Sequence, residues 1–166
     1  MFAWVYDRVS DASGDRGRDI VGGGGWGMAT MTQLGHVAFR VRDLERSKRW
    51  YGAAFSAREA FRGIDPDGTV QLIYLEFAPG QFIELFPGGN APPPPVERAL
   101  GYVHICLVVD DLATTLAHLA TLGIAPNAPP RAGRAAQRLA FINDLDGNQI
   151  ELMEIPPTST LYRAPH

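Results

Sequence analysis

The chain has 166 residues, enough for one ordinary domain or for two half-size modules that share a core. Its 46% hydrophobic and 20% charged residues are typical of a soluble globular protein, and no apolar run approaches the roughly 20 residues of a membrane span. A formal net charge of −3 argues against nucleic acid as a partner and favours a small-molecule ligand.

Residues 1–33 show no periodicity that a helix or a strand could use. The polar stretch SDASGDRGRD runs into VGGGG, so we predict a flexible N-terminal extension. The start MFAWVYDRVS lacks the basic segment and apolar run of a secretion signal. We therefore expect a cytoplasmic protein.

The first regular element begins after Leu34. Alternation in GHVAFRV places His36 and Arg40 on one face of a strand and Phe39 on the opposite, apolar face. Asp43 is a predicted N-cap, and apolar residues recur at helical spacing through Phe55, which indicates an amphipathic helix of about three turns. Further strands are predicted at 60–64, 70–77 and 81–86, so residues 34–87 form a predicted βαβββ module.

A proline-rich linker, residues 88–101, precedes a second occurrence of the same pattern in residues 102–157. A strand at 103–109 leads into a capping aspartate, Asp110 or Asp111, and a helix that ends at Gly123. Two later strands are predicted at 138–142 and 149–155, with a middle strand near 124–128. Residues 158–166 form a predicted C-terminal tail.

The only cysteine of the chain, Cys106, lies in the first strand of this second module. It cannot close an intramolecular disulfide, and no cysteine cluster offers a thiolate metal site. We interpret it as a small apolar strand residue in a reducing compartment.

The two modules repeat one pair of polar residues. His36 and His104 occupy the first strand of their modules, 68 positions apart, and Glu84 and Glu151 occupy the last strands, 67 positions apart. Each glutamate stands between two apolar residues, and a buried carboxylate needs a partner or a cation. Two imidazoles and two carboxylates together suit Zn, Ni, Co, Fe or Mn, and octahedral geometry would leave two positions open for substrate oxygens.

These features resemble the vicinal oxygen chelate superfamily, and the motifs HVAFRV, GYVHI and LAFINDLDGNQIEL are most similar to the glyoxalase I (lactoylglutathione lyase) enzymes. The resemblance covers residues 34 to 156. It implies an α+β fold in which two tandem βαβββ modules form curved mixed sheets around a central metal cavity. It also implies one divalent metal per site, held by His36, Glu84, His104 and Glu151, and a homodimer.

The resemblance further implies a carbon–sulfur lyase that moves a proton through a metal-bound enediolate of a hemithioacetal of glutathione. Glu151 is the first choice for the catalytic base and Glu84 the alternative. Arg40 matches an arginine that holds a substrate carboxylate, and the pleat of the strand places it on the face of His36. Gly88 and Leu100 depart from the asparagine and arginine that glyoxalase I enzymes carry there.

Two alternative functions remain open at this stage. A metal-dependent epimerase, or another enzyme of this superfamily with a substrate other than glutathione, would use the same four residues. A metal-free drug-binding protein of the bleomycin-resistance type would use the aromatic side chains instead, although such a protein has no need for two His–Glu pairs. Arg131, Arg134 and Arg138 could supply positive charge for an anionic substrate.

Overall fold

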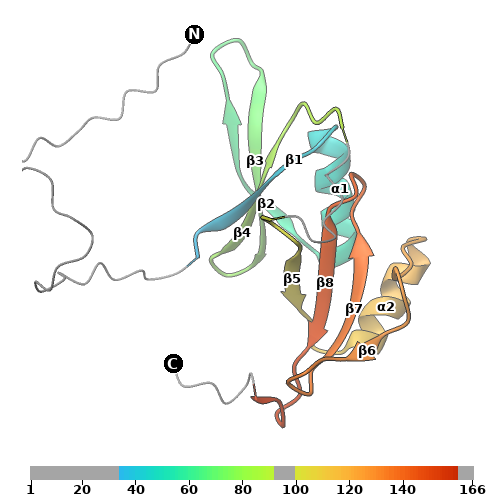
Figure 1. The fold of residues 1–166 in the computed structure, drawn as a ribbon. Helices are drawn as coiled ribbons and strands as arrows, with labels where there is room; N and C mark the ends of the chain where they lie inside the picture. Colours follow the sequence, from blue (N-terminus) through green and yellow to red (C-terminus); the bar gives the residue numbers. More distant parts are fainter. Residues whose placement is uncertain (1–33, 92–99, 161–166) are drawn as a thin grey trace, which may run out of the picture. The chain divides into compact units, whose positions relative to one another are not determined.

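In the computed structural model, residues 34–91 and 100–160 form two four-stranded mixed sheets and two helices (Figure 1). The predicted N-terminal extension, the proline run of the linker and the end of the C-terminal tail lie outside these described residues. No helix in the described parts of the chain is long and apolar enough to cross a membrane.

The first module contains one helix and the first sheet. Its elements are β1 (His36–Arg40), α1 (Leu44–Phe55), β2 (Arg58–Ile64), β3 (Val70–Ala78) and β4 (Gln81–Phe86). The strand order is β1-β4-β3-β2, with β1 parallel to β4 and the other neighbours antiparallel. Asp43 caps α1 as predicted, because its carboxylate accepts the backbone N–H of Arg46 at 2.9 Å.

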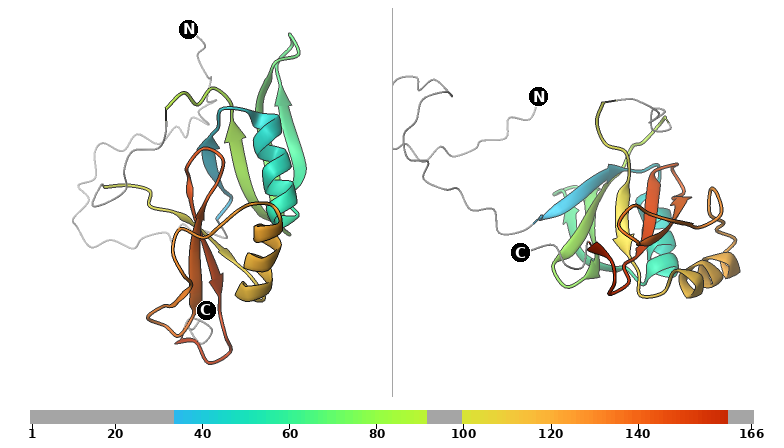
Figure 2. Two further views of the ribbon diagram at one scale, coloured as in Figure 1. Left: turned by 90° about the vertical axis from the view of Figure 1, so that its right-hand side faces the viewer. Right: turned by 60° about the horizontal axis from the view of Figure 1, so that its bottom comes forward.

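The second module repeats this topology. Its elements are β5 (Ile105–Val108), α2 (Leu112–Thr121), β6 (Arg131–Ala132), β7 (Arg138–Asn143) and β8 (Gln149–Glu154). The strand order β5-β8-β7-β6 again pairs the first strand of the module with its last strand in parallel. The predicted α+β fold of two βαβββ modules is confirmed, and each sheet remains open rather than closing on itself (Figure 2).

Two local expectations in the second module were wrong. The middle strand lies at Arg131–Ala132, beyond the predicted 124–128 segment, where Pro126 has no N–H for a ladder hydrogen bond. Strand β5 begins at Ile105, so His104 directly precedes the strand. The helix cap is Asp111, whose carboxylate accepts the backbone N–H of Thr114 at 2.6 Å.

A single hydrophobic core joins the two modules. It is formed by one face of each sheet together with the apolar sides of α1 and α2. The residues that are fully or almost fully buried include Ile73, Leu75, Ile83, Leu85, Leu112, Leu119, Ile142, Ile150 and Leu152. Each such side chain contributes roughly 1.5–3 kcal/mol relative to an exposed one. Phe39 also belongs to this core, so the prediction that its face of β1 is the apolar one is confirmed.

A buried hydrogen bond connects the modules next to this core. The hydroxyl of Tyr51 in α1 donates to Oδ2 of Asp144, in the turn between β7 and β8, at 2.8 Å. Asp144 also accepts from the side chain of Asn148 and from the backbone N–H of Asp146. Burial, followed by the charge of Asp144, raises the pKa of Tyr51 well above its usual value, so its hydroxyl remains a donor.

Candidate metal centre

The first His–Glu pair lies on the face of its sheet opposite to the core. The parallel pairing of β1 with β4 makes Glu84 a neighbour of the start of β1, and Nε2 of His36 lies 3.1 Å from Oε2 of Glu84. Ile83 and Leu85 point into the core on either side of Glu84, which directs its carboxylate to the other face. The side chain of Glu84 is 10% exposed and that of His36 is 40% exposed.

Tyr74 in β3 completes this first group of polar side chains. It is the register partner of Glu84, and its ring meets that of His36 edge-on at 5.3 Å. Its hydroxyl lies 3.5 Å from Nδ1 of His36. Burial, followed by a hydrogen bond to Glu84, raises the pKa of Tyr74. The sequence analysis did not assign Tyr74 to the metal site; the signal was the alternation of β3, where Ile73 and Leu75 face the core and Tyr74 therefore faces away from it.

The second His–Glu pair has nearly the same geometry on the second sheet. Nε2 of His104 lies 2.8 Å from Oε2 of Glu151, and the two side chains are 30% and 13% exposed. Phe141 in β7 is the register partner of Glu151 and meets the ring of His104 edge-on at 5.4 Å. Cys106 in β5 is the other register partner of Glu151. Burial, followed by the charge of Glu151, raises the pKa of Cys106 to about 12, so it is a thiol at neutral pH.

The four predicted ligands therefore lie as two pairs, one on each sheet. Among the described residues there is no group of three or more His, Cys, Asp or Glu side chains that could hold a metal ion. A single site formed by all four residues stays a prediction. Each module would supply two of the four ligands of that site.

Arg40 lies on the His36 face of β1, as the alternation predicted. Its Nη1 donates to the carbonyl oxygen of Pro87 at 2.7 Å, and its guanidinium lies 5.8 Å from the ring centroid of Phe86. Arg40 lines a cavity of about 460 Å³ that is also lined by Tyr102 and Asn148 of the second module. The guanidinium is held in one orientation by these contacts and keeps other N–H groups for an anionic ligand.

The three arginines near β6 and β7 differ in their partners. Arg138 is paired with Glu154 at 3.3 Å. Arg131 lies over the ring of Phe141 at 5.8 Å, which places its positive charge on the face of the second His–Glu pair. Arg134 is exposed in the turn between β6 and β7. Of the three, Arg131 is the one that the structure places near a predicted ligand pair.

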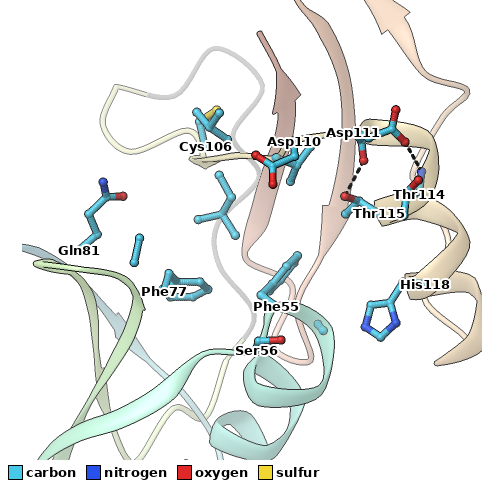
Figure 3. A pocket seen from close by; sticks show the side chains of 15 residues that line it. Phe55, Ser56, Phe77, Gln81, Cys106, Asp110, Asp111, Thr114, Thr115 and His118 are labelled. Carbon is cyan, nitrogen blue, oxygen red and sulfur yellow. Dashed lines mark hydrogen bonds between the residues drawn. The ribbon is translucent and has the colours of Figure 1, made fainter.

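A cavity of about 690 Å³ lies between the end of α1, strand β5 and the start of α2 (Figure 3). Its polar side chains include Asp110, Asp111 and His118, and none of the four predicted metal ligands lines it. Asp111 is occupied in capping α2, and Nε2 of His118 lies 2.9 Å from the carbonyl oxygen of Ala53. A smaller cavity of about 370 Å³ extends from His36 to Cys106 and Leu107 of β5.

This fold and the duplicated His–Glu pairs define the class of protein. Residues 33–152 match the model of the Glyoxalase/Bleomycin resistance protein/Dioxygenase superfamily, and the chain belongs to this superfamily. Many of its members are enzymes, and they typically use a divalent metal.

Individual proteins are also similar to this chain. The chain is 28% identical to a lactoylglutathione lyase of Haemophilus influenzae over 131 residues, 77% of this chain and 96% of that protein. A glyoxalase family protein from Enterococcus faecalis has the same fold, with a TM-score of 0.64 and 23% identity over 74% of this chain and 98% of that one. A fosfomycin resistance protein from Listeria monocytogenes also shares the fold, with a TM-score of 0.57 and 18% identity over 76% of this chain and 96% of that one.

Proposed function

We propose that this protein is a metal-dependent lyase or isomerase of the glyoxalase I type, acting on a hemithioacetal of glutathione or a related substrate with oxygens on neighbouring carbons. The observation that carries the proposal is the repetition of one His–Glu pair, with nearly the same geometry, at equivalent places of both modules. The similarity to a lactoylglutathione lyase supports the choice of reaction.

The donor atoms of each pair fit a divalent metal. In each pair one imidazole nitrogen and one carboxylate oxygen lie next to each other, at 3.1 Å and 2.8 Å, so both could contact the same ion. Nitrogen and oxygen donors favour Zn, Ni, Co, Fe or Mn over softer ions. A bound metal would act as a Lewis acid that lowers the pKa of the substrate carbon and stabilises the charge on its oxygens.

A second copy of the chain would complete the ligand set. Strands β1 and β5 are at the edges of their sheets. The backbone N–H groups of Val41 and Val109 bond inward to β4 and β8, so the alternate residues, including Ala38 and Cys106, direct their backbone groups to the free edge. Docking β1 of one copy beside β5 of the other would bring the two kinds of pair together, and twofold symmetry would form two such sites per homodimer.

Glu151 is the proposed base. It would remove the proton from the hemithioacetal carbon; the electron pair of that C–H bond forms a carbon–carbon double bond while the π pair of the neighbouring carbonyl moves to its oxygen. Return of the proton to the neighbouring carbon, with transfer of the hydroxyl proton of the first carbon to the oxygen of the second, gives the S-lactoyl thioester, so no other reactant is consumed. Arg40 would bind a carboxylate of the substrate, and Arg131 adds positive charge on the second face.

Two positions favour keeping an epimerase, or another enzyme of this superfamily, as the second candidate. Gly88 has a positive φ of 84° and offers no side chain where the glyoxalase I pattern has an asparagine. Leu100 offers no guanidinium where that pattern has an arginine. Both departures remove contacts to glutathione and leave the His–Glu pairs unchanged.

A drug-binding protein without a metal is the third candidate, since exposed aromatics such as Phe61 lie on the same open face.

The experiment that tests the proposal measures metal content and turnover together. Metal content is determined by plasma mass spectrometry, and formation of S-lactoylglutathione from methylglyoxal and glutathione is followed for the wild type and Glu151→Gln. Glu76→Gln is the matched control, because Glu76 lies in a strand of the first sheet but pairs with Arg58 rather than a histidine.

Stoichiometric metal with turnover that is lost in Glu151→Gln and kept in Glu76→Gln is the expected result. Metal without turnover would favour the epimerase or another substrate. No metal under any loading condition would contradict both enzyme proposals and favour the drug-binding protein.

A further inference from the structure

Two of the arginines in the strands differ from the others in having no carboxylate partner. Arg58, Arg62 and Arg138 each form an ion pair with a glutamate. Arg40 and Arg131 form none within the part of the chain that the structure describes. Each of these two guanidiniums therefore keeps N–H groups for an anion from outside the protein.

Arg40 lies at one end of the first half-site. It is two residues past Ala38, the register partner of Glu84, which places it about 6–7 Å further along the strand. Phe86 also follows Glu84 by two residues, and its ring centroid lies 5.8 Å from the guanidinium. The contact with Phe86 and the hydrogen bond to the carbonyl oxygen of Pro87 hold this charge at the end of the open face.

Arg131 lies in a different direction from the ligands of the second half-site. The ring of Phe141 separates it from them, because this ring meets that of His104 edge-on at 5.4 Å and its centroid lies 5.8 Å from the guanidinium of Arg131. Arg131 is in β6, two strands away from Glu151 in β8, or about 9–10 Å across the sheet. The first cation thus lies along the strands from its ligand pair, and the second lies across them.

The repeat does not relate the two arginines to each other. Val108, two residues past the register partner of Glu151, takes the place of Arg40 in the second module. Gly63 takes the place of Arg131 in the first module, because the register partner of each lies two residues before the aromatic partner of the glutamate. Each half of the site therefore carries one cation, and the two halves carry it on different sides of their ligands.

We propose that the substrate carries an acid group on each side of its two metal-binding oxygens, and that Arg131 is the specificity-determining residue for the second acid group. This inference rests on the proposed function, in which Arg40 binds one carboxylate of the substrate. Since Arg131 belongs to the other half of the site, the second acid group is on the part of the substrate derived from the aldehyde. The ring of Phe141 lies between the ligands and Arg131, so a short chain separates this acid group from the reacting carbons.

The test compares ligands of equal length with and without the second carboxylate. Protein loaded with Zn²⁺ or Co²⁺ receives glutathione and either 4,5-dioxopentanoate or 2-oxopentanal, and kcat/KM for thioester formation is measured. Each adduct isomerises to a 2-hydroxy thioester without another reactant. Calorimetry measures binding of 2-hydroxyglutarate and 2-hydroxypentanoate, which share a hydroxy acid that can chelate the metal and differ at the far end of the chain.

The variant is Arg131→Gln. Arg134→Gln is the matched control, because Arg134 is an exposed arginine in the turn between β6 and β7 and its replacement changes the net charge equally. We expect the wild type and the control to prefer the acid member of each ligand pair at least tenfold, as a hydrogen bond between charged groups provides. Arg131→Gln should lower this preference to less than threefold. Circular dichroism establishes that both variants fold.

Failure of the inference and failure of the proposed function are distinguishable. If the wild type forms thioester but does not prefer the acid ligands, or if Arg131→Gln keeps the preference of Arg134→Gln, the inference is wrong and the proposed function stands. Turnover of neither adduct would contradict the proposed reaction, whereas the preference between the two hydroxy acids would still decide the role of Arg131. If the wild type binds no metal, both are wrong.

Discussion

Replacement of Tyr51 by Phe tests whether the buried bond to Asp144 stabilises the joined modules. Tyr51 is 2% exposed and Asp144 is 9% exposed, so Tyr51→Phe removes the 2.8 Å bond without admitting water easily. A hydrogen bond to a charged group contributes about 1.5–3 kcal/mol. Asp144 still accepts hydrogen bonds from Asn148 and Asp146 in the variant. We therefore expect the free energy of unfolding to fall by about 1–2 kcal/mol.

Urea unfolding followed by circular dichroism measures this loss. The urea concentration at the midpoint should fall, while the dependence of the free energy of unfolding on urea concentration should not change. Tyr102→Phe is the matched control, because Tyr102 is 49% exposed and its hydroxyl makes only a long 3.5 Å bond to the carbonyl oxygen of Gln149. For this control we expect the free energy of unfolding to change by no more than about 0.5 kcal/mol. Equal midpoints for Tyr51→Phe and Tyr102→Phe would refute the reasoning that the buried bond contributes to joining the modules.

Three further predictions follow from shifted pKa values. Because the pKa of Tyr51 is raised in the folded protein, its contribution to stability is complete below about pH 10 and is lost as the pH rises above that value; unfolding curves of Tyr51→Phe should lack this alkaline loss. Hydrogen bonds from Arg62 and then Lys48 lower the pKa of Glu59 to about 2, so stability present above about pH 4.5 should decline as the pH falls toward 2, and Glu59→Gln should flatten this part of the stability profile. Since the pKa of Cys106 is about 12, alkylation by iodoacetamide at pH 8 should be much slower in the folded protein than in urea; equal rates would contradict the burial of its thiol.

The hydrophobic core and the candidate site lie on opposite faces of the same sheets. Each sheet uses one face for the common core and keeps the other for its His–Glu pair. Core residues such as Ile83 and Leu85 therefore determine where Glu84 points, because they occupy the alternate positions of the same strand. A register shift of one residue in β4 would bury the carboxylate in the core and expose both apolar side chains.

Local patterns in the sequence determined the elements and the faces of the strands. The alternation around His36 and Arg40, the N-cap at Asp43 and the repeated His–Glu spacing predicted the two βαβββ modules and the candidate ligands. These features depend on periods of two or 3.6 residues and on capping, so neighbouring residues in the chain are sufficient to establish them.

Contacts between distant segments were decided only by the tertiary structure. The bond from Tyr51 to Asp144, the place of Tyr74 beside His36, and the division of the ligands into two pairs depend on how sheets and helices dock. The short strand β6 also escaped prediction, since a two-residue strand after three prolines has too few residues for a periodic pattern. The sequence by itself thus determined which side chains form each half of the site. Docking of the sheets and helices against one another decided that the halves lie on separate sheets, because docking depends on surface complementarity rather than on local spacing.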